Sequence, residues 1–179
     1  MLKTNVDKLV KISVIGEVSS PAFRTPYRIS ANGTPVVLPS VGGITYNIRV
    51  GDPAAGWEAD HVEPGVSIKN KESDNANMAL NILASVGNEA VVVSGDAKGS
   101  KGAVTGKHGG IEHVLVDFPS DTMEKLLIGD KILIKAFGVG LKLLDFPDVK
   151  VMNVDPNFLE AMDPKPIDGK LEIPVTHII

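Results

Sequence analysis

The feature that most limits the fold of this chain is the contrast between one long helical segment and many short apolar runs. Residues 73–88, SDNANMALNILASVGN, carry apolar side chains at helical spacing. Ser73 or Asp74 can cap the first free amides, and Gly87-Asn88 can end the helix. We expect its buried stripe to consist of Ala79, Ile82, Leu83 and Val86. The other apolar runs are separated by Gly, Pro and Asp clusters, which is typical of strands and turns.

These short runs predict about seven to nine strands. The expected strands are residues 11–18, 44–50, 89–95, 112–118, 129–137, 148–154 and 170–179. Asp121, with Glu124 placed for a capping box, and residues 155–162, with a proline at the first helical position, predict short helical turns. The sequence therefore predicts an α+β, mostly β protein. Its core would be a short-stranded β-barrel or sandwich with an SH3-like hairpin and one main helix.

Length and composition indicate one soluble domain. The chain has 179 residues, of which 43% are hydrophobic and 22% charged, as in ordinary globular proteins. We expect a single β-rich domain over residues 1–179, with tentative sub-lobes at 1–70 and 71–179. Because the sequence stops on the apolar segment 170–179, we expect either an edge strand there or the N-terminal part of a longer protein.

The net charge and the absence of cysteine exclude or disfavour several kinds of partner and of chemistry. The net charge of −4 disfavours general binding to nucleic acid or to an anionic membrane. Cysteine is absent, which excludes disulfides, thiolate metal sites and cysteine nucleophiles and fits a reducing compartment. The sequence shows neither a signal peptide nor an apolar run long enough to span a bilayer. We therefore expect a cytoplasmic protein without a membrane partner.

A basic, glycine-rich segment follows the predicted strand 89–95. Three lysines lie in it with no acid between them, and consecutive glycine amides can line a concavity that holds an anion. The alternative is that the lysines only keep a turn soluble. The candidate ligand-binding residues are Lys98, Gly99, Lys101, Gly106 and Gly109.

Lys107 and His108 are the candidate catalytic residues of this segment. An imidazole with an ordinary pKa can act as general acid or base near neutrality. A nucleotide-binding P-loop is excluded, because the glycine spacing is one residue short and His108 stands where Ser or Thr would hold magnesium.

Residues 51–65, GDPAAGWEADHVEPG, form a second glycine-rich and charged segment. In an extended chain His61 and Glu63 project to one face, and with Asp60 they could hold a divalent metal. The alternative is an acidic surface loop. Trp57, the one tryptophan, is expected either to wall a ligand pocket or to fasten the loop to the core.

Two parts of the basic segment resemble known families. Gly95, Lys98, Gly99, Gly102 and Val104 have the spacing G-x-x-K-G-x-x-G-x-V, which resembles the KOW motif of ribosomal proteins and transcription elongation factors. That resemblance implies an SH3-like hairpin that contacts RNA or protein. Residues 105–109, TGKHG, look like the modified-lysine loop of eukaryotic and archaeal initiation factor 5A, which would make Lys107 the modified lysine.

Most of the chain resembles one prokaryotic family, domain-of-unknown-function family 4438. The resemblance rests on residues 51–68, 94–118, 128–143 and 146–156. Members of that family can carry additional sequence after this region. The family has no established activity, so the resemblance implies no mechanism.

Three hypotheses follow for function. The first is a small-molecule binding or enzymatic domain, in which segment 51–65 meets residues 105–110 around an anionic ligand. The second is a KOW-like adaptor that contacts RNA or a ribosomal partner through its lysines. The third is a structural domain whose glycines shape turns and a homo-oligomer interface. We favour the first hypothesis. The sequence does not identify the substrate, and the one cofactor it suggests is a divalent metal.

Overall fold

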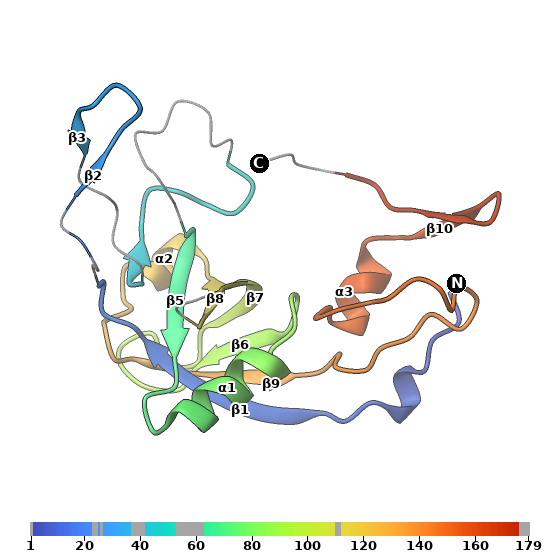
Figure 1. Ribbon diagram of the computed structural model, residues 1–179. Coiled ribbons are helices and arrows are strands. Elements are labelled where there is room, and N and C mark those ends of the chain that lie inside the picture. The colour runs from blue at the N-terminus through green and yellow to red at the C-terminus, as the bar shows by residue number, and fades with distance from the viewer. Residues whose placement is uncertain are drawn as a thin grey trace.

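The computed structural model describes residues 2–22, 25, 27–36, 42–52, 63–109 and 112–175, and it is mostly β (Figure 1). The helical elements are the 3-10 turn η1 (Val6–Lys8) and the helices α1 (Asp74–Leu83), α2 (Ser120–Met123) and α3 (Pro156–Ala161). The longer strands are β1 (Ile12–Val18), β5 (Gly65–Lys69), β6 (Glu89–Val92), β7 (Lys101–His108), β8 (His113–Asp117) and β9 (Lys131–Ala136). The shorter strands are β2 (Arg28–Ile29), β3 (Pro35–Val36), β4 (Ile44–Thr45), β10 (Lys165–Ile167) and β11 (Lys170–Glu172).

Six antiparallel strands close into a barrel in the order β1-β9-β6-β7-β8-β5. Pairing of Val18 with Ile68 and of Glu17 with Lys69 closes the ring between β1 and β5. β1 pairs with the C-terminal half of β5, and β4 pairs with Gly65 and Val66 in its N-terminal half. The prediction of a short-stranded, mostly β barrel with one main helix is confirmed. The barrel takes strands from both of the predicted sub-lobes, and the extent of the domain stays a prediction.

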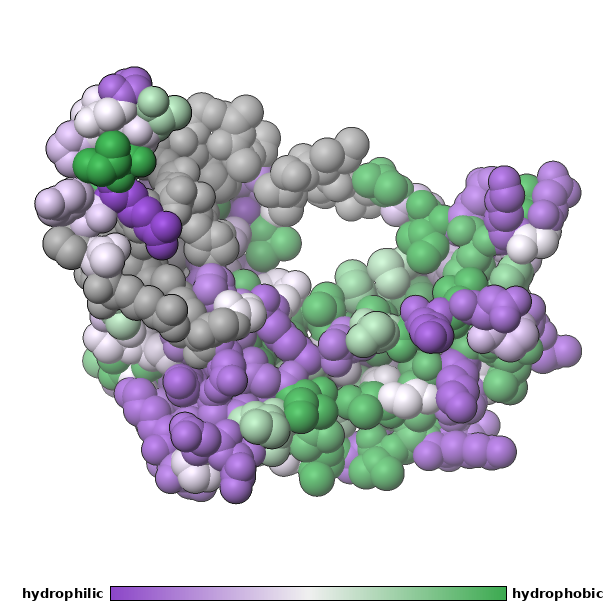
Figure 2. Space-filling view, in the orientation of Figure 1, coloured by the Kyte–Doolittle hydropathy of each residue, from purple (hydrophilic) through white to green (hydrophobic). Residues whose placement is uncertain are grey.

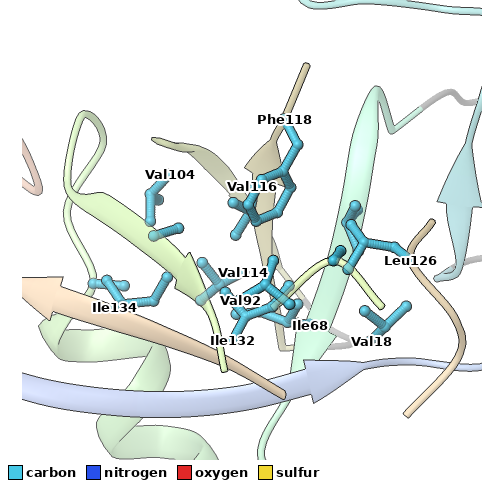
Figure 3. Close-up of a cluster of buried hydrophobic side chains, with 14 of the residues drawn as sticks. Val18, Ile68, Val92, Val104, Val114, Val116, Phe118, Leu126, Ile132 and Ile134 are labelled. Carbon is cyan, nitrogen blue, oxygen red and sulfur yellow. The ribbon is translucent and has the colours of Figure 1, made fainter. Parts of the chain in front are cut away.

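The barrel interior is filled by aliphatic side chains, most of them valine, isoleucine and leucine (Figure 3). Alternate residues of each strand supply them, because successive side chains of a strand point to opposite faces. Val66, Ile68, Val114 and Val116 are all fully buried. The intervening residues of β5 and β8 therefore lie on the outer face of the barrel, and the candidate site lies on that face.

A second hydrophobic cluster lies beside the barrel and joins the two ends of the described chain. It centres on Leu141, Leu143 and Leu159, with Leu2 and Leu9 packed against it. A cavity of about 590 Å³ opens between the N-terminal segment and α3. Figure 2 shows apolar side chains gathered on this part of the surface.

Asn88 links the second cluster to the barrel. Its side-chain amide donates to the carbonyl of Phe137 at 2.7 Å and to Asp155 Oδ2 at 2.8 Å, and its Oδ1 accepts from Ser85 N at 2.7 Å. Asp155 in turn caps α3 by accepting from Asn157 N. One buried amide therefore holds the start of β6, the end of β9 and the start of α3 together.

The main helix is present, although its buried stripe differs from the predicted one. Ser73 caps α1 as predicted and accepts from Ala76 N. The fully buried side chains of the helix are Asn77 and Leu80, and Ile82 is 55% exposed. Asn77 is buried because its amide bonds Asn70 N and the carbonyl of Glu112. The helix ends at Leu83 rather than at Gly87-Asn88.

Several predicted strands are shorter than expected or absent. Of residues 89–95 only β6 is a strand, and of residues 170–175 only β11 is. Of residues 44–50 only β4 is a strand, because Tyr46 would next face Pro64, which has no N–H to donate. Residues 148–154 form isolated bridges, Lys142 with Lys150 and Val86 with Val154, instead of a strand. The predicted helical turns are present as α2 and α3, but no side chain caps α2.

The glycine-rich segment forms the turn between β6 and β7. Gly95 and Gly99 both have positive φ there, and Lys98 is exposed at the turn. The hairpin itself is thus present, while its relation to the KOW motif stays a prediction. Among the residues that the structure describes, none of the helices has the length and apolar character to cross a membrane.

Candidate functional site

Polar side chains gather on the outer face of the barrel where the β7–β8 hairpin turns. His108 of β7 lies directly opposite His113 of β8, and Ser67 of β5 lies opposite Leu115 of the same strand. Because the residues between them fill the core, these side chains share the outward face. We call Ser19, Glu63, Ser67, His108 and His113 the polar cluster.

Glu63 is the charged centre of the polar cluster, and its side chain is 7% exposed. Its Oε2 accepts from Ser67 Oγ at 2.7 Å, and its Oε1 lies 3.4 Å from His108 Nε2. The backbone is held as well, because Thr45 Oγ1 donates to the carbonyl of Glu63 at 2.8 Å. The carboxylate is therefore fixed from both sides and can orient the imidazole.

Gly65 makes this placement of Glu63 possible. It has a φ of +85°, and a Cβ built on it would lie 2.4 Å from the carbonyl oxygen of Val116. Only glycine tolerates both conditions. The chain can therefore enter β5 in close contact with β8, with Glu63 beside Ser67 and His108.

His113 is a buried member of the polar cluster, with 5% of its surface exposed. Burial lowers the pKa of His113, Lys69 and His108 lower it further, and the charge of Glu63 acts in the opposite direction. Its Nδ1 has no hydrogen-bond partner among the described residues. The imidazole is thus held toward its neutral form.

Ser19 adds a second buried polar group without a partner in the described chain, at its Oγ. Gly42 lies between Ser19 and His113, since a Cβ built on Gly42 would lie 3.6 Å from Ser19 Cβ and 3.3 Å from His113 Cε1. Buried polar groups are nearly always hydrogen-bonded in proteins. Two such groups beside one carboxylate–imidazole pair therefore mark a place where a bound molecule would find donors and acceptors.

The chemistry open to this arrangement is acid–base exchange and binding of a small polar ligand. A carboxylate on one imidazole nitrogen fixes the tautomer and strengthens the other nitrogen as a base. When protonated, the same imidazole donates to an anion. A neutral histidine such as His113 can accept a hydrogen bond or ligate a metal.

The structure brings together two of the residues that the sequence singled out, Glu63 and His108. Lys107 lies opposite the core residue Val114 and so projects from the other face of β7. It is half-buried, and burial lowers the pKa of its ammonium group. Lys107 and His108 therefore do not converge on one ligand position.

Lys98, Gly99 and Lys101 lie at the opposite end of β7 from the polar cluster. Seven residue steps from Lys101 to His108 correspond to about 23 Å along a strand. Lys101 Nζ lies 3.2 Å from Glu89 Oε2, so its charge is partly compensated. Lys98 and Lys101 therefore lie at one end of β7 and Lys107 lies near the other. Binding of an anion or of RNA by these lysines stays a prediction.

The remaining candidates have different positions. Gly106 lies in β7 beside a β-bulge, with Leu115 Cδ1 3.8 Å from a built Cβ, and Gly109 follows β7 with open space around it. The calls on Trp57, Asp60 and His61 fall outside the described residues. Within the described ranges, no three His, Asp or Glu side chains are arranged to hold a metal ion.

Sequence reasoning missed His113, Ser67 and Ser19. His113 lies in the predicted strand 112–118, where alternation of apolar and polar residues does not distinguish a functional histidine from a structural one. The signal that could have found it is the short connection after His108, which places residues 108 and 113 opposite each other in a hairpin. No local pattern marks Ser19 or Ser67, because they reach the cluster through pairing between distant strands.

The fold and the site define a β-barrel domain with a buried carboxylate–histidine cluster on its outer face. The chain belongs to the family described as domain of unknown function DUF4438, N-terminal, whose model matches residues 27–160. It is also similar to a solved structure named "Crystal structure of TM1086", with 54% sequence identity and a TM-score of 0.91 over 97% of this chain. That match spans 61% of the solved chain. No curated protein matches.

Proposed function

We propose that this domain binds a small anionic molecule at the polar cluster and that His108 exchanges a proton with it. The observation that carries the proposal is the 3.4 Å contact between Glu63 Oε1 and His108 Nε2. It joins the two glycine-rich segments in which functional residues were expected. The substrate and the reaction class follow from no single residue here, so the proposal covers both a binding domain and an enzyme.

Three features support an anionic ligand. His108 gains a positive charge when protonated and then donates to an oxyanion. Ser19 Oγ is a hydroxyl donor without a partner among the described residues. Gly109, just after His108, is exposed and adds a backbone amide next to the imidazole in the chain. The carboxylate of Glu63 alone would repel an anion. Its hydrogen bond with Ser67 and its contact with His108 weaken that repulsion.

Ligand-induced stabilisation tests this proposal. Inorganic phosphate and small carboxylates such as citrate should raise the melting temperature of the native chain, because a ligand of the folded state stabilises it by mass action. His108→Ala should abolish the shift. Lys98→Ala is the matched control, since Lys98 is exposed at the far end of β7. An unchanged shift in His108→Ala, together with a lost shift in Lys98→Ala, would place the anion at the other end of the strand.

A divalent metal is a second candidate for the same place. The sequence proposes Asp60, His61 and Glu63 as ligands. The observation that favours a metal is the buried His113, whose pKa is lowered by burial and whose Nδ1 has no hydrogen-bond partner among the described residues. Because the described residues contain no complete ligand set, this candidate requires Asp60 or His61. A bound metal could also hold the anion as its counter-ion.

Calorimetric titration with Zn²⁺ or Mn²⁺ separates the two candidates. A metal site predicts binding by the native chain and strong loss of affinity in both His61→Ala and His113→Gln. Phosphate binding that persists in EDTA would show that the anion needs no metal. Absence of any metal-induced heat would remove the second candidate and leave the first in place.

A further inference from the structure

A cavity of about 320 Å³ lies where β8 ends and α2 begins, away from the polar cluster. One wall comes from the segment after β4 and the other from the β8–α2 connection. Its lining residues include Tyr46, Ile48, Arg49, Asp117, Phe118 and Met123. Phe118 and Met123 are buried, so the floor of the cavity is apolar and fixed by the core.

Three charged side chains line this cavity: Arg49, Asp117 and, exposed at the end of α2, Glu124. The guanidinium of Arg49 and the carboxylate of Asp117 do not contact each other. Burial raises the pKa of Asp117, while a hydrogen bond from the backbone of Phe118 and the charge of Arg49 lower it. Arg49 and Asp117 both line this one cavity, on its two opposite walls. They form no ion pair within 4.0 Å, and the ion pairs found in the described chain involve other side chains.

We infer that this cavity is a second ligand site, which binds a small zwitterion: an α-amino acid with an apolar side chain. A guanidinium presents a planar fork that matches a carboxylate. A partly buried carboxylate accepts strong, charge-assisted hydrogen bonds from an ammonium group. An α-amino acid carries both groups on one carbon atom, so it can bridge Arg49 and Asp117. Its side chain would contact Phe118 and Met123.

The second site is independent of the proposed function. Asp117 and His113 lie on the same outer face of β8 but four residues apart, which corresponds to about 13 Å along the strand. A small amino acid is too short to touch both. Loss of the polar cluster would therefore leave binding at the Arg49–Asp117 site unchanged.

Calorimetric titration of the native chain with L-leucine tests the inference. Two analogues isolate its charges: leucinamide lacks the carboxylate, and 4-methylpentanoate lacks the ammonium group. We expect leucine to bind and each analogue to bind at least about tenfold more weakly, because each leaves one protein charge unpaired. Absence of leucine binding at millimolar concentration, or equal binding of the three compounds, overturns the inference.

Variants locate the site. Arg49→Gln and Asp117→Asn should each reduce leucine affinity roughly tenfold or more. Arg49 is exposed, so its replacement leaves folding intact even if Asp117→Asn does not. Asp121→Asn is the matched control, because Asp121 is exposed on α2 and does not line the cavity. Leucine affinity that Arg49→Gln leaves unchanged would contradict the assigned site. His108→Ala should bind leucine normally whatever happens to phosphate binding.

Discussion

At the scale of single residues, the polar cluster is a small set of groups whose charges depend on one another. Glu63 holds His108 and also opposes the lowering of the His113 pKa by burial. Lys69 and His108 act with burial on His113. The cluster therefore contains one imidazole oriented by a carboxylate and a second imidazole kept toward neutrality by its surroundings.

The lowered pKa of His113 predicts how stability depends on pH. In the window between its folded pKa and the ordinary value of about 6.5, the unfolded chain binds more protons than the folded chain. The free energy of unfolding should therefore fall as the pH is lowered through this window. Urea unfolding from about pH 7.5 to about pH 5 measures it.

His113→Gln should flatten this pH dependence, because glutamine does not titrate. Asp117, whose pKa is raised, contributes the opposite slope above its ordinary value of 3.8, so the comparison between native and variant chains is the informative quantity. An identical slope in His113→Gln and in the native chain would show that His113 is not the group responsible.

Ser67→Ala tests whether Glu63 is held by its neighbours. The change removes the 2.7 Å hydrogen bond to Glu63 Oε2 and leaves a buried carboxylate oxygen without that donor. We expect a loss of about 1–3 kcal/mol in the free energy of unfolding. Ser13→Ala, on an exposed part of β1, should change it by less than about 0.5 kcal/mol. Equal effects of the two changes would contradict a role for Ser67 in positioning Glu63.

At the scale of elements, local patterns predicted where strands and helices lie better than where they end. The N-cap Ser73 and the proline that opens α3 are local signals, and both are confirmed. The end of α1 depends on Asn88, whose Oδ1 accepts a hydrogen bond from the backbone amide of Ser85. Asn88 holds this position because the neighbouring strand β6 begins directly after it. Asn77 is buried for the same kind of reason, so hydrophobic periodicity could not find it.

The candidate site was predictable to the same limited degree. Charged residues in two glycine-rich segments predicted that these segments meet, and the Glu63–His108 contact agrees with that prediction. Lys98, Lys101 and Lys107 form one group in the sequence because they are close along the chain. An extended strand of eight residues, β7, holds Lys101 and Lys107 far apart in space. His113 and Ser67 enter the cluster through strand register, which a single sequence does not display.

Gly65→Ala tests the close approach of β5 and β8. An added Cβ would meet the Val116 carbonyl at 2.4 Å, and the φ of +85° is strained for alanine. We expect a loss of more than about 2 kcal/mol in the free energy of unfolding. Gly129→Ala is the matched control, because it has a φ of +93° but open space around it, and it should cost only about 1–2 kcal/mol. Similar losses in both variants would mean that steric contact adds nothing at Gly65.

At the scale of the whole molecule, a closed barrel and a second hydrophobic cluster depend on one buried amide. Asn88 contacts both bodies, through Phe137 of the barrel side and Asp155 at α3. The second cluster is small and has few fully buried side chains. Its position relative to the barrel should therefore depend strongly on polar contacts such as these.

Asn88→Ala tests this joint. The change leaves the Phe137 carbonyl, the Ser85 amide and an Asp155 oxygen without their partner, and we expect a loss of about 3 kcal/mol or more in the free energy of unfolding. Limited proteolysis should cut the variant faster between residues 138 and 165. Asn47→Ala, at an exposed position, should change neither measurement. Unchanged cleavage in Asn88→Ala would show that the second cluster is held by other contacts.

The seam between β1 and β5 has a consequence for how such a chain can diversify. The chain leaves the ring at Val18 and re-enters it at Gly65, and Val18 then pairs with Ile68. Its exit and entry points are thus neighbours, so a change in the sequence between them need not alter the closure of the ring. Residues 19–64 supply Ser19, Arg49 and Glu63 to the two proposed sites. Related proteins could therefore acquire new binding preferences through substitutions in residues 19–64, while the strands of the barrel stay the same.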